Sequence, residues 1–361
     1  MKNVLVTASG SPGFLTVRKA IRACTQLAGN ITIHGCDSNP SSLGLKMVDF
    51  SFVAPQGSAT NYVSTIYDYC KKNSIDLIIP CADEEMIPLS RSVKKFEDVG
   101  CMILSPPCNV LETCLNKKKL FDFFSLGDLS KYIVENYVCN DVRGLCDSYD
   151  KLVRNGYSVC VKPVKAHGSR GFRVIEETPS RDDFFDKKPV GTSVTIETLC
   201  QILGDGPFDD LLVMEYLPGV EYSVDSFKRG HDFLCIPRTR RVVKEGICVA
   251  GQTCNNKELI NIAERVYNEL GLRYNANIQF RYDREGRPKL LEINPRFSGT
   301  MEHCRASGVN FVEVALHEAF DIRQIDYEIK WGVKMQRVWS EVFEYESQLY
   351  TLDEGNISND R

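Results

Sequence analysis

The fold is decided by the stretch Leu290-Leu291-Glu292-Ile293-Asn294-Pro295-Arg296, in which an apolar strand ends in three polar groups of different chemistry. Alternation along a strand places Glu292 and Asn294 on one side and leaves Leu291 and Ile293 on the other. A carboxylate and an amide oxygen that point together into a cleft suit Mg²⁺, which takes few protein ligands and keeps waters or phosphate oxygens. The stretch therefore predicts a magnesium site and, with it, a nucleotide.

Arg296 follows this strand directly after Pro295. We expect its guanidinium to leave the strand beside the metal, where a fixed fork of donors can hold a phosphoryl or carboxylate group. A strand that simply ends in a polar turn is the alternative, because a short motif is by itself only a hypothesis.

Composition narrows the possible classes of protein. The chain has 361 residues, of which 43% are hydrophobic, so it is long enough for two or three domains. A net charge of -4 provides no basic surface for nucleic acid, which we do not expect as a partner. The 15 cysteines include no C-x-x-C pair, and no apolar run is long enough to cross a membrane. We expect a reduced cytoplasmic protein without structural zinc and without a membrane partner.

The first hundred residues alternate short β-rich runs with helical periodicity, which predicts a parallel sheet with crossover helices. The expected strands are residues 4–7, 31–36, 77–80 and 101–104, and the expected helices are residues 16–27 and 62–72.

The loop Ser9-Gly10-Ser11-Pro12-Gly13 follows the first of these strands, and Asp37 ends the second. This arrangement resembles a dinucleotide site, so an NAD(P)-dependent oxidoreductase is one hypothesis. The glycine spacing departs from G-x-G-x-x-G, however, and Pro12 removes an amide that could bind pyrophosphate.

Pro106-Pro107 breaks the chain and predicts a domain boundary, so we divide the chain into residues 1–108, 109–330 and a C-terminal strand with a polar tail at 331–361. In the second domain, Lys117 starts a helix and Lys162 lies in a β-branched strand. The loop that follows contains Gly168, Ser169 and Gly171, and its glycines let backbone amides approach an anion. A phosphate grip is one interpretation, and an ordinary hairpin turn is the other.

A third segment, residues 211–225, runs from an apolar strand through Pro218-Gly219 into a strand with alternating polar residues. Backbone groups of Glu215, Tyr216 and Leu217 can pair with a purine edge, and Glu221 can accept from ribose hydroxyls. The alternative is a hairpin with one solvated face.

Cations follow in the run from Pro237 to Ile247. Arg238 and Arg240 face one side of a strand, with Lys244 in phase if that strand continues. These three side chains either bind the substrate carboxylate or the transferring phosphoryl group, or form a solvated charged face.

The order of these motifs resembles the ATP-grasp superfamily, in particular single units similar to the large subunit of carbamoyl phosphate synthetase. The motifs are Asn-Lys at a helix start, Val-Lys-Pro with a glycine loop, Met-Glu-Tyr-Leu-Pro-Gly-Val-Glu-Tyr, Asn-Ile-Gln-Phe and Leu-Glu-Ile-Asn-Pro-Arg. The likeness covers about residues 1 to 320. It implies a Rossmann-like pre-ATP-grasp domain with a parallel sheet, followed by a two-subdomain ATP-grasp fold of α/β and α+β class whose lid subdomain spans about residues 115–215.

The resemblance also implies a role for each site residue. Lys117 and Lys162 would contact the phosphates of ATP, the loop from Gly168 through Ser169 to Gly171 would close over them, and Glu215, Tyr216, Leu217 and Glu221 would frame adenine and ribose. Gln279, Glu292 and Asn294 would hold Mg²⁺, with Mn²⁺ as a substitute. A hairpin through the turn at residues 283–286 brings the strand of Gln279 beside the strand of Glu292.

The activity implied is that of a carboxylate-amine ligase, which activates a small-molecule carboxylate as an acyl phosphate and forms a C–N bond with release of ADP and phosphate. Arg296, Arg238, Arg240 and Lys244 are the candidate catalytic cations. Members that resemble carbamoyl phosphate synthetase carry a second arginine where this chain has Gly299, so the bicarbonate site is in doubt. A non-catalytic ATP-binding module is a further alternative, and homodimerisation is expected by family analogy alone.

Overall fold

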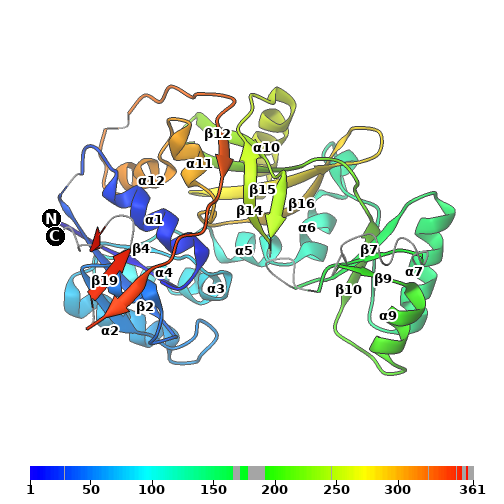
Figure 1. Ribbon diagram of the computed structural model, residues 1–361, viewed down its shortest axis with the longest axis horizontal. Coiled ribbons are helices and arrows are strands. Elements are labelled where there is room, and N and C mark those ends of the chain that lie inside the picture. Colours follow the sequence, from blue (N-terminus) through cyan, green and yellow to red (C-terminus); the bar gives the residue numbers. More distant parts are fainter. Residues whose placement is uncertain are drawn as a thin grey trace.

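The computed structural model describes the chain except for residues 28, 166–170, 178–191, 245, 324, 347, 352–354 and 357–361. Its ribbon has three parts: an N-terminal sheet at one end, a lobe with α7 and α9 at the other, and a central antiparallel sheet between them (Figure 1). The predicted fold class, a parallel-sheet domain followed by a two-part α+β module, is confirmed.

The N-terminal sheet is parallel throughout, with strand order β3-β2-β1-β4-β5. All four predicted strands are present, but the sequence analysis missed β3, whose exposed residues do not form an apolar run. The elements are β1 (Lys2–Val6), α1 (Pro12–Arg22), β2 (Ile31–Asp37), β3 (Phe50–Val53), α2 (Tyr62–Asn73), β4 (Leu77–Ile79), α3 (Asp83–Arg91), α4 (Val93–Glu97) and β5 (Met102–Ile103).

The loop after β1 is held by its own domain. Asp37 accepts hydrogen bonds from the Gly10 amide at 2.6 Å and from the Asn39 amide at 2.8 Å. Pro12 is the first residue of α1, where its missing amide costs no helical hydrogen bond. Asp37, the acid that would bind the ribose in the oxidoreductase hypothesis, therefore has both carboxylate oxygens in local use.

The lobe is a five-stranded sheet with order β6-β10-β7-β8-β9, flanked by helices. Asn116 caps the helix of Lys117, since its side chain accepts from the Lys119 amide at 3.0 Å. The elements are α5 (Cys108–Cys114), α6 (Lys117–Phe124), β6 (Asn136–Cys139), α7 (Val142–Arg154), β7 (Val159–Pro163), β8 (Arg173–Ile175), β9 (Ser193–Val194), α9 (Ile196–Leu203) and β10 (Leu211–Glu215).

The central sheet is antiparallel, with order β12-β11-β15-β16. Leu259, Ile262, Ala263 and Val266 of α10 recur at helical spacing and are all buried, so this helix covers one face of the sheet. The other face carries polar residues and also Phe227 and Ile236, which belong to a second core cluster. The elements are β11 (Glu221–Arg229), β12 (Asp232–Thr239), β13 (Val242–Lys244), β14 (Ile247–Gln252), α10 (Lys257–Leu270), β15 (Ala276–Tyr282), β16 (Pro288–Asn294), α11 (Glu302–Ala306) and α12 (Phe311–Ala319).

The predicted hairpin between β15 and β16 is confirmed, but its register shifts between Gln279 and Phe280. Leu290 and Ile293 belong to the hydrophobic core, whereas Leu291 is half-buried at a cavity. The expectation that Leu291 lies on the same side as Ile293, opposite to Glu292, is therefore wrong, because Leu291 and Glu292 both line the cavity and an irregularity in the strand pairing breaks the simple alternation.

After α12 the chain returns to the N-terminal part (Figure 1). β17 (Lys334–Gln336) pairs with β14, and β18 (Phe343–Tyr345), β19 (Gln348–Thr351) and β20 (Gly355–Asn356) form a small sheet. Glu344 forms an ion pair with Lys46, which fastens this segment to the first domain.

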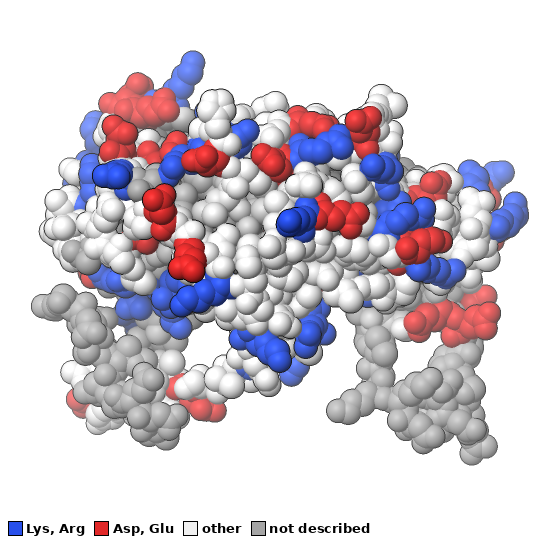
Figure 2. Space-filling model, turned by 90° about the horizontal axis from the view of Figure 1, so that it is seen from above, with Lys and Arg blue, Asp and Glu red and all other residues white. Residues whose placement is uncertain are grey.

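Charges of both signs are interspersed on the face seen from above, around a broad area without charged side chains (Figure 2). All 15 cysteines are free thiols. Within the described ranges, no helix combines the length and the hydrophobicity needed to cross a membrane.

Candidate functional site

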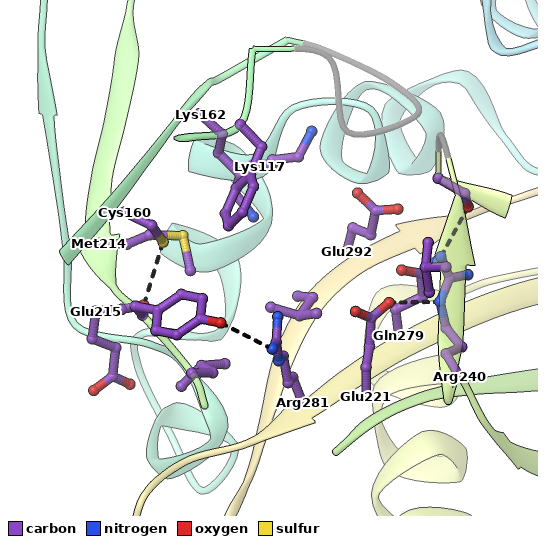
Figure 3. A pocket seen from close by; sticks show the side chains of 16 residues that line it. Lys117, Cys160, Lys162, Met214, Glu215, Glu221, Arg240, Gln279, Arg281 and Glu292 are labelled. Atoms are coloured by element: carbon purple, nitrogen blue, oxygen red, sulfur yellow. Dashed lines mark hydrogen bonds and ion pairs between the residues drawn. The ribbon is translucent and has the colours of Figure 1, made fainter. Parts of the chain in front are cut away.

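A cavity lies where the lobe meets the central sheet (Figure 3). Strands β7 and β10 of the lobe contribute one wall, and β11, β15 and β16 of the central sheet contribute the other. Its mixed apolar and charged walls suit a small-molecule ligand. Its lining residues are Lys117, Cys160, Lys162, Phe172, Met214, Glu215, Tyr216, Leu217, Glu221, Arg240, Val243, Gly246, Gln279, Arg281, Leu291 and Glu292.

Lys117 and Lys162 enter the cavity from the lobe, and Glu292 enters it from the central sheet (Figure 3). Lys117 begins α6, and its amide donates to the carbonyl of Val164 at 3.3 Å, which ties the helix to the end of β7. Burial, together with the charge of Lys117, lowers the pKa of Lys162 to about 8. Two neighbouring ammonium groups at a partly buried wall favour an anionic ligand, because an anion offsets their mutual repulsion.

Of the predicted glycine loop, Gly168 and Ser169 lie outside the described residues. Gly171 has φ of 72°, and a Cβ at this position would approach the ring of Pro163 to 2.7 Å. Glycine is therefore required where the loop rejoins the lobe, both for its left-handed backbone and for its close contact with β7.

The predicted adenine segment forms the opposite side of the cavity, where Glu215 extends its carboxylate away from the lysines (Figure 3). The amides of Glu215 and Tyr216 donate to Glu135 and Ser158 of neighbouring segments. The amide of Leu217, in contrast, has no hydrogen-bond partner among the described residues. Leu217 thus offers a backbone donor at the wall of the cavity.

Arg281 was not predicted, although it lies in the centre of the site (Figure 3). It donates to the carbonyl of Gly219 at 3.0 Å and to the hydroxyl of Tyr216 at 3.3 Å, and its guanidinium lies 5.1 Å from the centroid of the Tyr216 ring. It thereby fixes the Pro-Gly turn and the aromatic wall. Its position two residues after Gln279 on one strand face is the signal that could have found it.

Glu221 and Arg240 enter the cavity as an ion pair, with an N–O distance of 2.6 Å. Arg240 also donates to the carbonyl of Gly246 at 2.9 Å, which connects it to the β13–β14 turn. The structure therefore brings the predicted ribose contact and one predicted catalytic cation together, and each partially neutralises the other.

Gln279 and Glu292 lie directly opposite each other on β15 and β16, and both line the cavity. Asn294 lies farther along β16 and donates to a carboxylate oxygen of Glu292 at 3.2 Å. Two of the three predicted metal ligands thus face the cavity, and the third contacts one of them.

Arg238 and Lys244 do not line the cavity. Arg238 is fully buried and donates to Asp225 and Ser298, both at 2.9 Å. Lys244 is exposed on β13, a strand separate from β12, so the condition that would put it in phase with Arg238 is not met. The chain leaves the strand conformation at Arg240 and Arg241, which ends the alternation on which that expectation depended.

Arg296 makes a bidentate ion pair with Asp83 of α3, with distances of 2.8 and 3.2 Å. Burial alone would lower the pKa of Arg296, but the Asp83 carboxylate raises it above its usual value. The pair joins the central sheet to the N-terminal domain next to Glu292, so most of the donor fork is already in use.

Arg337, which follows β17, was also not predicted, and it donates to the carbonyl of Gly299. Burial, with the nearby charge of Arg238, lowers the pKa of Arg337, and its Nε has no partner among the described residues. A guanidinium from the C-terminal segment therefore lies beside the position that lacks the expected second arginine. No local pattern could reveal this, because about 40 residues separate the two positions.

Two family models match the chain. Residues 207–340 match the model described as "ATP-grasp in the biosynthetic pathway with Ter operon", and residues 4–104 match "PylC-like, N-terminal domain". The search of curated proteins gave no match.

Many solved structures are similar over most of the chain. An ADP complex of N5-carboxyaminoimidazole ribonucleotide synthetase is 12% identical, with 92% of this chain and 80% of that chain covered and a TM-score of 0.67. The biotin carboxylase domain of 2-oxoglutarate carboxylase from Hydrogenobacter thermophilus, a dimer with MgADP, ADP and bicarbonate, is 16% identical, with coverage of 92% and 73% and a TM-score of 0.68. An L-amino acid ligase from Bacillus licheniformis is 13% identical, with coverage of 88% and 74% and a TM-score of 0.59. The predicted resemblance is confirmed: the fold is that of ATP-grasp proteins.

Proposed function

We propose that this chain, whose fold is the ATP-grasp fold, is an ATP-dependent ligase that activates a small-molecule carboxylate and joins it to an amine. One observation carries the proposal: a single cavity is lined by the lysine pair and the backbone donor of Leu217 from the lobe, and by the facing Gln279 and Glu292 from the central sheet. The lysines suit the phosphates of ATP, the acidic and amide side chains suit a metal ion, and the backbone donor suits the adenine base.

The donor set fits Mg²⁺. Glu292 supplies a carboxylate and Gln279 an amide oxygen from neighbouring strands, and both are hard oxygen ligands. Asn294 would complete the set or orient Glu292 through its hydrogen bond. When bound, the ion would neutralise charge on the phosphates of ATP during phosphoryl transfer. The solved neighbours with ADP and MgADP support this choice of cofactors.

The residues of the chain would act mainly by positioning and charge neutralisation. Lys117 and Lys162 would hold phosphate oxygens, while Leu217 would donate to the purine edge between the apolar walls of Met214 and Leu291. An oxygen of the substrate carboxylate would attack the γ-phosphorus and release ADP, and the amine would then displace phosphate from the acyl phosphate. No protein nucleophile is needed in this sequence.

A cation must also hold the substrate carboxylate. Arg240 lies in the cavity, and Arg337 lies beside Gly299 with an unpartnered Nε, so these two arginines have the best structural support. The roles suggested for Arg296, Arg238 and Lys244 stay predictions, because their side chains are ion-paired elsewhere or exposed. A homodimer also stays a prediction.

The test is a coupled assay of ADP release with pools of carboxylic acids and amines. We expect one acid to stimulate ADP release and an amine to increase it further. Glu292→Ala should abolish the stimulation, whereas the control Glu197→Ala, an exposed acid on α9, should retain it.

Two results would contradict the proposal. ATP binding without ADP release in any pool would support the non-catalytic module. A change in NADH fluorescence, with no acid stimulating ATP turnover, would support the oxidoreductase.

A further inference from the structure

A chain of hydrogen bonds runs beneath the proposed metal ligands, along the polar face of the central sheet. Gln279 donates to the side-chain oxygen of Asn277 at 3.3 Å, and Asn277 donates to Asp225 at 2.9 Å. Asp225 lies opposite Asn277 in the strand register, and it is fully buried. The chain therefore leads from the cavity to a buried carboxylate.

At the buried end of this series of hydrogen bonds, a positive charge holds Asp225 in place. Arg238 donates to the second oxygen of Asp225 at 2.9 Å, and the thiol of Cys304 also donates to that oxygen at 3.4 Å. Arg238 and Asp225 form a fully buried ion pair, and Arg238 is itself held by Ser298. An ionised carboxylate can only accept hydrogen bonds, so Asp225 imposes a direction on every partner.

This direction is transmitted residue by residue. Because Asp225 accepts, Asn277 must present its NH₂ group to it, and its oxygen then faces Gln279. Gln279 must in turn present its own NH₂ group to Asn277, which turns its oxygen away from the chain. The same amide in the opposite orientation would aim two N–H donors at the metal position, and a cation would be repelled.

We propose that Asp225 is a positioning residue that acts through Asn277 to turn the side-chain oxygen of Gln279 toward the metal position. The inference rests on the proposed function, because it takes Gln279 as a magnesium ligand. It also assigns a role to Arg238, which holds Asp225 in place through their ion pair without entering the cavity. A neutral glutamine needs hydrogen bonds that fix which way its amide is turned. A glutamate at that position would not need them, since its two oxygens are equivalent.

The test is Asp225→Asn, which conserves shape but removes the fixed direction. The new amide would give its oxygen to Arg238 and its NH₂ group to Asn277, so Asn277 and Gln279 would both reverse. We expect the Kd of Mn²⁺ alone, measured from the electron paramagnetic resonance signal of the free ion, to rise about tenfold or more. The Kd of ATP in EDTA should stay within about twofold, which shows that the nucleotide cavity is intact.

The rescue variant is Gln279→Glu. In the background of Gln279→Glu, Asp225→Asn should no longer weaken Mn²⁺ binding, because a carboxylate presents an oxygen in either orientation. A general loss of folding could not be rescued in this way. If Asp225→Asn fails to fold, Asn277→Leu interrupts the same chain while leaving the ion pair of Arg238 in place, and the same rescue is expected.

Three results would overturn the inference. Equal Mn²⁺ affinity of the wild type and Asp225→Asn would do so, and so would a loss that persists with Gln279→Glu. If Glu292→Ala binds Mn²⁺ as tightly as the wild type, the metal site of the proposed function fails as well. A loss in Glu292→Ala without a loss in Asp225→Asn overturns the positioning role alone.

Discussion

Two sets of polar groups at strand ends behave differently in this molecule. Asp37, at the end of β2, accepts from the amides of Gly10 and Asn39 and so stabilises a loop of its own domain. Glu292 and Gln279, on the two strands of the central hairpin, face a cavity that they share with two lysines. The acceptors of the first set are used by local hydrogen bonds, and we call this set closed. The second set faces a cavity that a ligand can enter, and we call it open. Similar residues thus serve structure or binding according to the partners that the fold supplies.

The strongest challenge to this comparison is Glu292→Ala. If the open set binds Mg²⁺, loss of its only carboxylate should lower kcat for ADP formation about a thousandfold or more. Mn²⁺ titration should show the same loss, whereas the urea midpoint should move little. Unchanged turnover in the best acid pool would mean that Glu292 is as structural as Asp37.

Lys162→Met addresses the cationic side of the cavity. We expect kcat/KM for ATP to fall about a hundredfold, because a buried phosphate contact is removed. Stability should not fall, since the buried charge is also removed. A control with Lys165→Met, which follows the same strand outside the cavity lining, should behave as the wild type.

Arg296→Met tests whether the bidentate pair with Asp83 is structural, like the hydrogen bonds of Asp37, or serves ligand binding. Removing the arginine that faces the buried Asp83 carboxylate should lower the free energy of unfolding by about 2–3 kcal/mol, and adding Asp83→Asn should restore part of it. Urea denaturation measures both effects. Lost turnover with unchanged stability would instead support the predicted catalytic role of Arg296.

The pH dependence of ATP binding should report Lys162. Its pKa of about 8 means that the ammonium, the form that attracts phosphate, loses its proton as the pH rises through that value. The Kd of ATP, measured by calorimetry without metal, should therefore rise up to about tenfold between pH 7 and pH 9. Lys162→Arg stays charged over this range and should show a flat profile.

The smallest effect is expected for Asp37→Ala. Loss of the acceptor for two loop amides should lower the free energy of unfolding by about 1–2 kcal/mol and leave the Kd of ATP unchanged. Thermal denaturation and calorimetry test the two parts. If the variant keeps its stability but loses nucleotide binding, the N-terminal loop is a ligand site and the comparison is wrong.

The sequence predicted those parts of the molecule that depend on local pattern. Short apolar runs located the four main strands of the parallel sheet, and the turn at residues 283–286 correctly placed Gln279 opposite Glu292. Leu291 was misplaced, because it is the extra residue of an irregularity in β16, which the local pattern of residue types does not reveal.

Other features depend on contacts between distant residues, which one sequence does not reveal. The run of cations from Arg238 to Lys244 looks uniform, yet one member is buried against Asp225, one enters the cavity and one is exposed. Arg337 reaches Gly299 only because the C-terminal segment returns along β14. The surroundings of these arginines differ because the fold gives each one different contact residues, although the residue type is the same.

The pairing of β17 with β14 has a practical consequence for shortening the protein. A truncated chain that stops near residue 330 would keep every residue that lines the cavity but would remove the strand that covers one side of β14. The bare backbone groups of β14 would then be available to pair with another molecule. We therefore expect such a fragment to aggregate on purification, although its cavity is complete in sequence.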